Sequence, residues 1–491
     1  MEPRTPLDYD PETMRQMGYR VVDTLVDYWR TLPERPIGTR PHPETLQAML
    51  SEPTPTQPMP FEQVLDEFLH KVLPHLIKVD HPRYFAFVPA PNEYVGVLAD
   101  LLSAGMNIFV GTWMVGAGAT QVEQVVIRWL CDWFGMPASA GGLFVSGGSV
   151  ANLVCLTAAR QRYPDALARG RVYYSDQTHS CVARAWRILG LREKQLCVLP
   201  ADEHFQIPLS LLAEQIERDR AEGLLPFCVV ANAGTTNTGA VDPLNELADL
   251  CEREGLWLHA DGAYGAAAIL TQEGAQRLQG IHRLDSLAVD PHKWLYQPMM
   301  AGCAIVREFE HLRAAFRILP PYLQDKERGA AGVDLCDYGV ELSRNFRALK
   351  LWMSLKTHGI EAFRQAMEHN LRLARVAEDA LRGLPRWRII SPATMGILAF
   401  RYEPPEQTPE QTDALNRALV DAMIADGYAM VSSTILRGRV ALRMCTLNPR
   451  ASEADVLETL RRLDALAERQ QTLQAGLSEP SANITSDARL S

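Results

Sequence analysis

Short apolar segments alternate with amphipathic segments from about residue 92 to residue 345, and this alternation constrains the fold most strongly. The apolar segments are short and end in polar turns, as in GGLFVSGGS, RVYYSDQTHS, LWLHADGAYG and SLAVDPHKW. The segments between them, such as LSLLAEQIERDRAEG and LNELADLCEREG, have the apolar spacing of helices. Strands that alternate with helices predict an α/β domain with a mainly parallel sheet and helices on its faces.

Residues with reactive or charged side chains follow the predicted strands. Parallel sheets bind ligands outside the carboxyl ends of their strands, so these residues are candidates for one shared site. They are Gly148 and Ser149, His179, Thr235 and Thr236, Asp261, and His292 with Lys293.

Lys293 stands between the apolar run Ser286–Val289 and Trp294. A lysine in such a position is either at the surface or is buried for a chemical purpose, because desolvating an ammonium group is costly. A desolvated amine with a lowered pKa is suited to Schiff-base chemistry with a carbonyl group. We therefore treat Lys293 as the first candidate for catalysis.

Each of the other candidates has an ordinary structural explanation when it is taken alone. Gly148 and Ser149 open a predicted helix, where free N–H groups can bind an anion, but a tight turn with a serine cap is commoner. Asp261 could pair with a buried cation or cap a helix, and His179 could be structural. Together they match one cofactor, pyridoxal 5′-phosphate, which needs a phosphate site, a carboxylate for its ring nitrogen and a lysine for its aldehyde.

The chain resembles the group II decarboxylases that depend on pyridoxal phosphate, the family of aromatic-L-amino-acid decarboxylase. HADGAYG, followed 32 residues after Asp261 by the lysine of DPHKW, is similar to the family signature. Further segments occur in the family order: MRQMGYRVVDTLVDYWRTLPERP, HPRYFAFVPAP, QVVIRWLCDWFGMP, VSGGSVANLVCLTAAR, DQTHSCVARA, ANAGTTNTGAVDPL and SRNFRALKLWMSLKTHG. The resemblance covers nearly the whole chain.

The resemblance implies that Lys293 forms a Schiff base with the cofactor and that an L-amino acid is decarboxylated to the amine and CO2. Asp261 pairs with the ring nitrogen, Ala263 packs on the ring, and His179 stacks on the other face and contacts the substrate carboxylate. The cofactor-binding set that it implies is Gly148, Ser149, His179, Thr236, Asp261, Ala263, Asp290, His292 and Lys293.

The resemblance implies that N-terminal segments line the substrate side of the site, and Phe87, Ala90 and Trp113 join His179 as the expected substrate contacts. The aromatic residues of these segments favour an aromatic amino acid; they are Phe85, Phe87, Tyr94, Phe109 and Trp113. Family members carry a loop tyrosine that protonates Cα. Tyr338 is the candidate here, although it lies about three residues too close to the Arg344 motif. We expect the segment from Tyr322 to Ser343 to close over the site.

The resemblance also implies fold type I, that of aspartate aminotransferase, with a seven-stranded sheet and a homodimer whose sites lie at the subunit interface. We expect an N-terminal helical segment at 1–90 that packs on the partner subunit and a large cofactor-binding domain at 91–345. A small α+β domain is expected at 346–470 and a disordered tail at 471–491.

Composition excludes several classes of protein. The net charge of −10 and the lack of a basic run argue against nucleic-acid binding. No apolar run approaches the roughly 18 residues of a membrane span. The nine cysteines are scattered without metal-site or disulfide spacing, which is typical of a cytoplasmic protein with reduced thiols.

Alternatives remain open at this stage. Loss of CO2 could be followed by oxidative deamination to an aldehyde, or the substrate could be a non-aromatic amino acid. An aminotransferase would use the same lysine and aspartate, and a scaffold could bind the cofactor without catalysis. A metal site built from His259, Asp261 and His292 would belong to a different class of protein.

Overall fold

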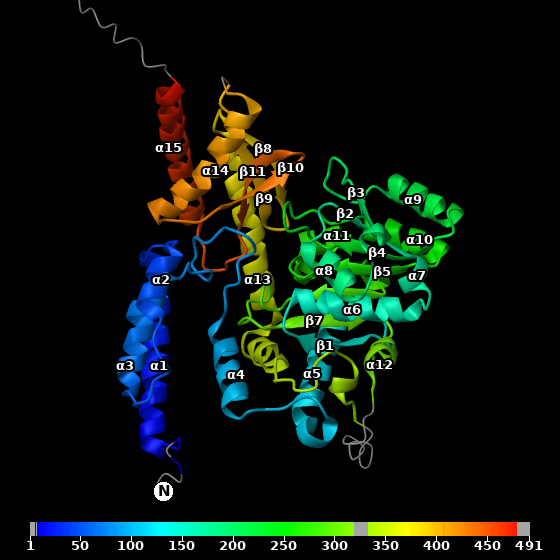
Figure 1. Ribbon diagram of the computed structural model, residues 1–491, viewed down its shortest axis with the longest axis horizontal. Helices are drawn as coiled ribbons and strands as arrows, with labels where there is room; N and C mark the ends of the chain where they lie inside the picture. The colour runs from blue at the N-terminus through cyan, green and yellow to red at the C-terminus, as the bar shows by residue number, and fades with distance from the viewer. Residues whose placement is uncertain (1–4, 6, 319–331, 406, 479–491) are drawn as a thin grey trace, which may run out of the picture. The chain divides into compact units, whose positions relative to one another are not determined.

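The computed structural model describes residues 5, 7–318, 332–405 and 407–478 (Figure 1). Its central feature is a seven-stranded sheet whose strands are β1 (Gly141–Val145), β2 (Gly170–Ser175), β3 (Leu196–Leu199), β4 (Leu225–Asn232), β5 (Trp257–Asp261), β6 (Ser286–Val289) and β7 (Gly302–Val306). Every residue of β1, β5, β6 and β7 is buried. Strands with both faces covered need continuous apolar runs, which explains SLAV and GCAIV.

The strand order is β1-β7-β6-β5-β4-β2-β3. The pairs of β2 with β3 and β4, of β4 with β5 and of β5 with β6 are parallel, whereas β7 is antiparallel to both of its neighbours. The mainly parallel seven-stranded sheet that the sequence predicts is therefore confirmed. The parallel strands bring their carboxyl ends to one edge, and Asp261 lies there beside Asn232 of β4.

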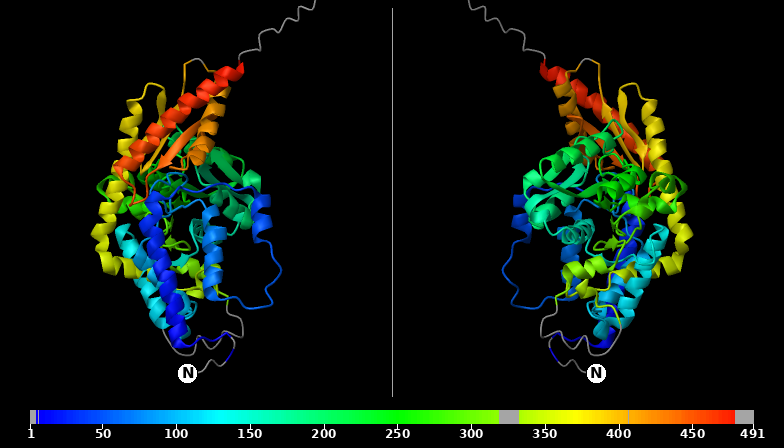
Figure 2. Two further views of the ribbon diagram at one scale, coloured as in Figure 1. Left: turned by 90° about the vertical axis from the view of Figure 1, so that its left-hand side faces the viewer. Right: turned by 90° about the vertical axis from the view of Figure 1, so that its right-hand side faces the viewer.

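Helices pack on this sheet and bury its apolar side chains. Helix α6 packs against β5, β6 and β7 and against α8, while α9 and α10 pack against β4 and α5 packs against β1 (Figure 1). Helix α13, drawn in yellow in Figure 2, is interrupted at Gly359, whose φ of 72° lies outside the helical region. The helices of this part of the chain are α4 (Tyr94–Gly105), α5 (Trp113–Trp133), α6 (Gly148–Arg162), α7 (Ala166–Arg169), α8 (Ser180–Ile188), α9 (Leu209–Ala221), α10 (Leu244–Glu254), α11 (Gln272–Arg277), α12 (Glu310–Phe316) and α13 (Ala348–Arg382).

The chain forms two compact units. One comprises the described residues of Met1–Phe85, Tyr402–Leu442 and Arg450–Ser491, and the other comprises those of Ala86–Arg401 and Arg443–Pro449. The remaining helices are α1 (Pro11–Thr31), α2 (Pro43–Leu50), α3 (Phe61–Glu67), α14 (Pro409–Asp426) and α15 (Glu453–Ser478). A second sheet has the order β10-β11-β9-β8, formed by β8 (Trp387–Thr394), β9 (Ile397–Tyr402), β10 (Ser432–Leu436) and β11 (Arg439–Cys445).

The domain boundaries expected at residues 90, 345 and 470 stay a prediction. The two compact units do not test them, because each unit combines segments that are distant in the sequence. Residues 471–478, which the sequence placed in a disordered tail, continue helix α15 instead. Residues 479–491 lie outside the described residues. Among the helices of the described ranges, none is both long and apolar enough to cross a membrane.

Candidate active site

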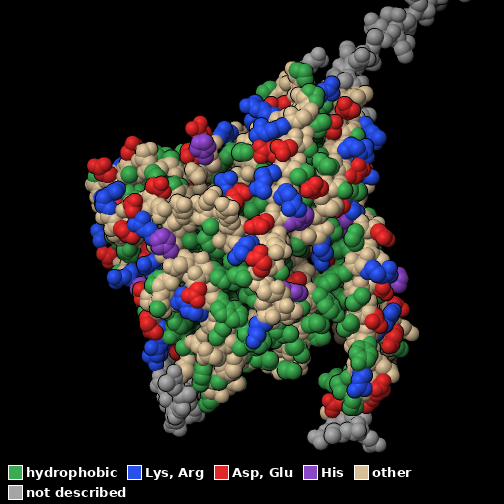
Figure 3. All heavy atoms as spheres, turned by 180° about the vertical axis from the view of Figure 1, so that it is seen from behind, with side chains coloured by type: hydrophobic (Ala, Val, Ile, Leu, Met, Phe, Trp, Pro, Cys, Tyr) green, Lys and Arg blue, Asp and Glu red, His purple; other side chains and the backbone are tan. Residues whose placement is uncertain are grey.

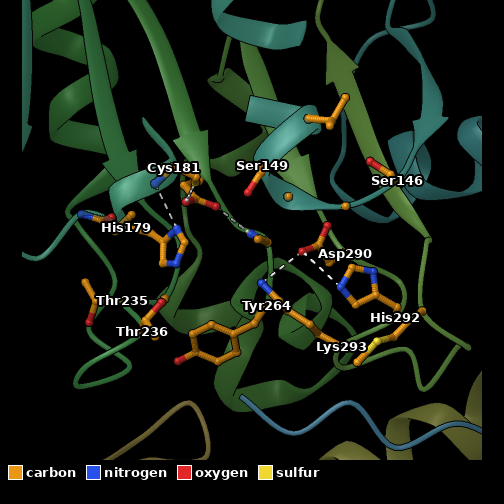
Figure 4. A pocket seen from close by; sticks show the side chains of 18 of the residues that line it. Ser146, Ser149, His179, Cys181, Thr235, Thr236, Tyr264, Asp290, His292 and Lys293 are labelled. Carbon is orange, nitrogen blue, oxygen red and sulfur yellow. Dashed lines mark hydrogen bonds and ion pairs between the residues drawn. The ribbon is translucent and has the colours of Figure 1, made fainter. Parts of the chain in front are cut away.

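A cavity of about 440 Å³ opens at the carboxyl edge of the seven-stranded sheet (Figure 4). Its walls come from the segments that follow β1, β2, β4, β5 and β6, as the parallel topology requires. All of the cofactor-binding residues expected from the sequence line it: Gly148, Ser149, His179, Thr236, Asp261, Ala263, Asp290, His292 and Lys293. The structure thus gathers side chains that are up to 145 positions apart, from Gly148 to Lys293.

The first wall of the cavity is the turn at the start of α6. A Cβ atom on Gly148 would lie 2.8 Å from Asp290 Oδ2 and 3.0 Å from the Cβ of Ala263, so only glycine fits. A Cβ atom on Gly302 of β7 would lie 2.5 Å from the Cα of Gly147. This close packing leaves the backbone N–H groups at the helix start open toward the cavity, and such groups bind phosphate.

Lys293 projects into the cavity from the turn after β6. Its Nζ lies 3.0 Å from Asp290 Oδ2, and His292 Nε2 lies 3.7 Å from the same oxygen (Figure 4). Burial is the largest single influence and would lower the pKa of Lys293, but Asp290 and Asp261 together outweigh it and raise that pKa. The lowered pKa expected from the sequence is therefore wrong. The sequence shows that the lysine is desolvated but not that two carboxylates face it.

Asp261 ends β5 and is 8% exposed. Its Oδ1 accepts a hydrogen bond from the backbone N–H of Ala263 at 3.1 Å, and its Oδ2 lies 3.8 Å from Cys181 Sγ. These contacts fix the direction of the carboxylate. A buried carboxylate held in this way is suited to a cationic nitrogen on a ligand.

His179 caps helix α8 across the cavity. Its Nδ1 accepts a hydrogen bond from the N–H of Cys181 at 3.2 Å, and the residue itself is exposed in this structure (Figure 4). One ring nitrogen is thus anchored while the ring remains available for a flat ligand. With the helix start at Gly148, the carboxylate of Asp261 and the amine of Lys293, the cavity fits pyridoxal phosphate.

The substrate contacts expected from the sequence are not part of this cavity lining. Phe87 is 58% exposed and has a φ of 48°, and neither Ala90 nor Trp113 lines the cavity. Met299 and Met300 line it instead. The role of Phe87, Ala90 and Trp113 therefore stays a prediction, and apart from His179 the structure does not bring these residues to the cofactor residues.

Tyr338 is also placed differently from the expectation. Its ring stacks on Phe309 with the centroids 4.1 Å apart, and its hydroxyl donates to Glu310 at 3.4 Å. Phe309 in turn packs against Gly141, the residue that begins β1, so Tyr338 lies toward the opposite edge of the sheet from Lys293. Because a local sequence motif cannot reveal this long-range packing, the sequence placed Tyr338 wrongly at the site. Of the expected lid, Tyr322 to Ser343, residues 322–331 lie outside the described residues.

The metal site considered from the sequence does not assemble. His259 is fully buried, and its two ring nitrogens are hydrogen-bonded to Ser286 Oγ and Asn152 Oδ1 at 2.8 Å and 2.7 Å. In the part of the chain that the structure describes, the residues close enough to share a metal ion are His179, Cys181 and Asp261. Burial and the neighbouring Asp261 raise the pKa of Cys181, which keeps its thiol protonated and makes it a poor metal ligand.

Several wall residues were missed from the sequence, among them Cys181 and Tyr264 as well as Met299 and Met300. Cys181 follows His179 by two positions, and its place on the first turn of α8 is a signal that was available. Tyr264 follows Asp261 by three positions, and its buried hydroxyl has no hydrogen-bond partner among the described residues. No local sequence pattern indicated that Tyr264 lines the cavity, because its ring is positioned by stacking on Trp294, which is distant in the sequence.

Comparison with known proteins agrees with this geometry. Residues 43–403 match the pyridoxal-dependent decarboxylase conserved domain. The chain is 46% identical over 465 residues to aromatic-L-amino-acid decarboxylase of Bacillus atrophaeus, covering 94% of this chain and 97% of that protein. It is 32% identical to phenylacetaldehyde synthase of Arabidopsis thaliana, covering 91% and 94%. The crystal structure of Oryza sativa TDC with PLP and tryptamine matches with a TM-score of 0.89 at 30% identity, covering 95% of this chain and 99% of that one.

Proposed function

Because the chain belongs to the pyridoxal-dependent decarboxylase family, we propose that it converts an aromatic L-amino acid to its amine and CO2. The observation that carries the proposal is the convergence of Lys293, Asp261 and His179 on one cavity. The family establishes the enzyme class and the cofactor. The roles of the individual residues and the identity of the substrate are our proposal.

Different cavity residues would bind different parts of the cofactor. The N–H groups at Gly148 and Ser149, with His292, would hold the cofactor phosphate, and Lys293 would hold its aldehyde. Asp261 would hold the ring nitrogen, since its carboxylate is buried and already directed by Ala263. Bound pyridoxal phosphate supplies an electron sink for the bond that breaks.

Lys293 and His179 are the groups that would handle the substrate. With its amine not bonded to the cofactor, Lys293 would be able to accept a proton, and Asp290 at 3.0 Å is placed to stabilise the resulting ammonium. His179, on the exposed side, would contact the substrate carboxylate and keep that group oriented for release as CO2. Orienting one bond of the substrate in this way selects decarboxylation over loss of the Cα proton.

The names of the relatives support an aromatic substrate. The Bacillus atrophaeus protein is named for aromatic amino acids, and the Oryza sativa structure contains tryptamine. The wall residues Met299 and Met300 are compatible with this choice because methionine packs well against aromatic rings.

An aldehyde synthase is the second candidate. The Arabidopsis thaliana relative is named phenylacetaldehyde synthase, and Tyr338 is not in the cavity to protonate Cα. The two outcomes differ after the release of CO2, because an aldehyde synthase also consumes O2 and releases ammonia.

The experiment is a panel of purified amino acids that includes phenylalanine, tyrosine, tryptophan, DOPA and glutamate. CO2, amine, aldehyde and keto acid are measured in each reaction. We expect CO2 and amine in equal amounts from at least one aromatic substrate. Aldehyde with ammonia would replace our proposal with the second candidate, and keto acid without CO2 would contradict both.

We also propose that the protein is a cytoplasmic homodimer. All nine cysteines are free, which supports a reducing compartment. Leu101 of α4, Met106 directly after it, and Met114 and Val115 of α5 are 61% to 68% exposed, and Figure 3 shows a face on which hydrophobic side chains gather. Large exposed apolar areas are typical of subunit interfaces. Sedimentation at micromolar concentration tests the dimer, and a stable monomer would contradict it.

A further inference from the structure

A chain of buried hydrogen bonds runs behind the cavity and ends on Asp261. It begins at Trp257 on β5, crosses to β6 and α6, and returns through α8. Its polar members other than the two ends, Ser286, His259, Asn152 and Cys181, are between 0% and 4% exposed. Buried polar groups are costly unless they are hydrogen-bonded, so a continuous network of this kind needs a reason.

The first half of the network has a definite donor direction. Trp257 Nε1 can only donate, and it donates to Ser286 Oγ at 2.8 Å. Ser286 Oγ lies 2.8 Å from His259 Nδ1. Burial lowers the pKa of His259 to about 4, so the ring is neutral at pH 7 and carries one N–H group. Which nitrogen carries it depends on the second half of the network.

Asn152 decides the direction of that second half. Its Nδ2 lies 2.8 Å from the carbonyl oxygen of Gly148, which can only accept, so this end of the side chain must be the NH2 group. Its Oδ1 therefore accepts from His259 Nε2 at 2.7 Å. His259 Nδ1 is then the bare nitrogen, which accepts from the hydroxyl of Ser286.

Cys181 joins the network to the cofactor site. Its Sγ accepts from Asn152 Nδ2 at 3.5 Å and lies 3.8 Å from Asp261 Oδ2. Burial and the charge of Asp261 raise the pKa of Cys181, so the thiol stays protonated and donates a hydrogen bond to the carboxylate. Every donor in the network thus points toward Asp261, and each group has one consistent protonation state.

We propose that Cys181, Asn152 and His259 are positioning residues for Asp261, and that their one-way hydrogen-bond network holds this carboxylate in the orientation that the cofactor ring nitrogen requires. The inference rests on the proposed role of Asp261. The thiol binds one carboxylate oxygen while the N–H of Ala263 binds the other, so the side chain is held from two directions. Without the thiol, the hydrogen bond from Ala263 is the one that remains to the carboxylate among the residues that the structure describes.

The test compares Cys181→Ala and Cys181→Ser with a matched control. Serine keeps a donor at the same position, whereas alanine removes it. Cys251→Ala is the control, because Cys251 is also buried but belongs to α10 and is not part of the network. For each holoenzyme the visible absorbance of the bound cofactor is titrated with pH, and kcat, KM and the melting temperature are measured.

We expect Cys181→Ala to lower kcat about tenfold with KM changed less than twofold, and to shift the pH midpoint of the cofactor absorbance by more than half a unit. Cys181→Ser should restore most of both effects, and Cys251→Ala should change neither. A purely structural role would lower the melting temperature of Cys181→Ala without moving the absorbance midpoint. That result would overturn the inference, as would a Cys181→Ala enzyme identical to the wild type.

A second variant keeps the test decisive if Cys181→Ala fails to fold. Asn152→Ser removes the amide that donates to the Cys181 thiol, which is the group next to Asp261 in the network. This variant should give a smaller shift of the absorbance midpoint in the same direction. An unchanged midpoint in a folded Asn152→Ser enzyme would contradict the network. Failure of the proposed function looks different, because the wild-type protein would then release aldehyde and ammonia, or keto acid, in place of the amine, whatever the absorbance midpoints of the variants.

Discussion

Replacing Asp290 by asparagine should speed the capture of pyridoxal phosphate by the free protein. Lys293 attacks the cofactor aldehyde only as a neutral amine, and Asp290 Oδ2 at 3.0 Å from its Nζ stabilises the ammonium form. The Asp290→Asn side chain keeps the shape of the aspartate but removes its charge. Asp290 is also the neighbour of Gly148, so its charge opposes the arriving phosphate as well.

The size of this effect follows from the distance. Two unit charges at 3.0 Å attract by about 5 kcal/mol when the effective dielectric constant is about 20. Desolvation of the pair offsets most of this attraction. We take a net stabilisation of the ammonium of about 1.4 kcal/mol, which corresponds to a factor of about ten in the amount of neutral amine.

The assay mixes cofactor-free protein with pyridoxal phosphate and follows the visible absorbance between pH 6 and pH 10. We expect about tenfold faster capture by Asp290→Asn near pH 7. Because Asp290 and Asp261 hold the pKa of Lys293 above its ordinary value of 10.5, the wild-type amine stays protonated throughout this range, and the difference should persist from pH 6 to pH 10. Asp176→Asn is the control, since Asp176 is an exposed carboxylate after β2. Equal or slower capture by Asp290→Asn at pH 7 would refute the reasoning.

Lys293→Ala should abolish both turnover and the visible absorbance of bound cofactor, and an enzyme that keeps either at wild-type level would contradict the proposed role of the lysine. Asp261→Asn should lower kcat on the order of 100-fold while some cofactor remains bound, because a neutral amide loses about 2.7 kcal/mol of stabilisation of the cationic ring; unchanged kinetics would reduce Asp261 to a structural role. Tyr338→Phe should leave the ratio of amine to aldehyde unchanged, since among the described residues its hydroxyl bonds to Glu310 at 3.4 Å and does not line the cavity, and a shift toward aldehyde would restore it as a proton donor. Burial lowers the pKa of His259 from 6.5 to about 4, so the stability that this residue contributes above pH 6.5 should be lost as the pH falls toward 4. Urea titrations should show a shallower loss of stability in His259→Gln than in the wild type, and parallel curves would contradict this.

The sequence predicted the parts of the site that depend on local pattern. Asp261 and Lys293 were identifiable because each follows an apolar run, and parallel strands bring such positions to one edge. The antiparallel direction of β7 was not predictable, because it depends on pairing with β1 more than 150 positions earlier, as in Gly141 with Val306.

Properties that arise from packing were the ones missed. The raised pKa of Lys293 depends on two carboxylates whose distance from the amine is fixed only by the fold. Tyr338 has the right residue type in a suitable segment, but its ring finds a better partner in Phe309. Cys181 was overlooked although it follows His179 by two positions, because only the fold places its sulfur 3.8 Å from Asp261 Oδ2.

The contact between Gly147 and Gly302 sets a limit on how this enzyme can be redesigned. A Cβ atom on Gly302 would come within 2.5 Å of the Cα of Gly147, so the start of β7 and the turn before α6 leave no room for a side chain at this end of the cavity. Another part of the wall, at Met299 and Met300, is formed by flexible side chains that are more than half exposed. Libraries that aim at new substrates should therefore accept many replacements at the two methionines and almost none at the two glycines. Selection would act on one wall of the cavity while the other remains the same in every descendant.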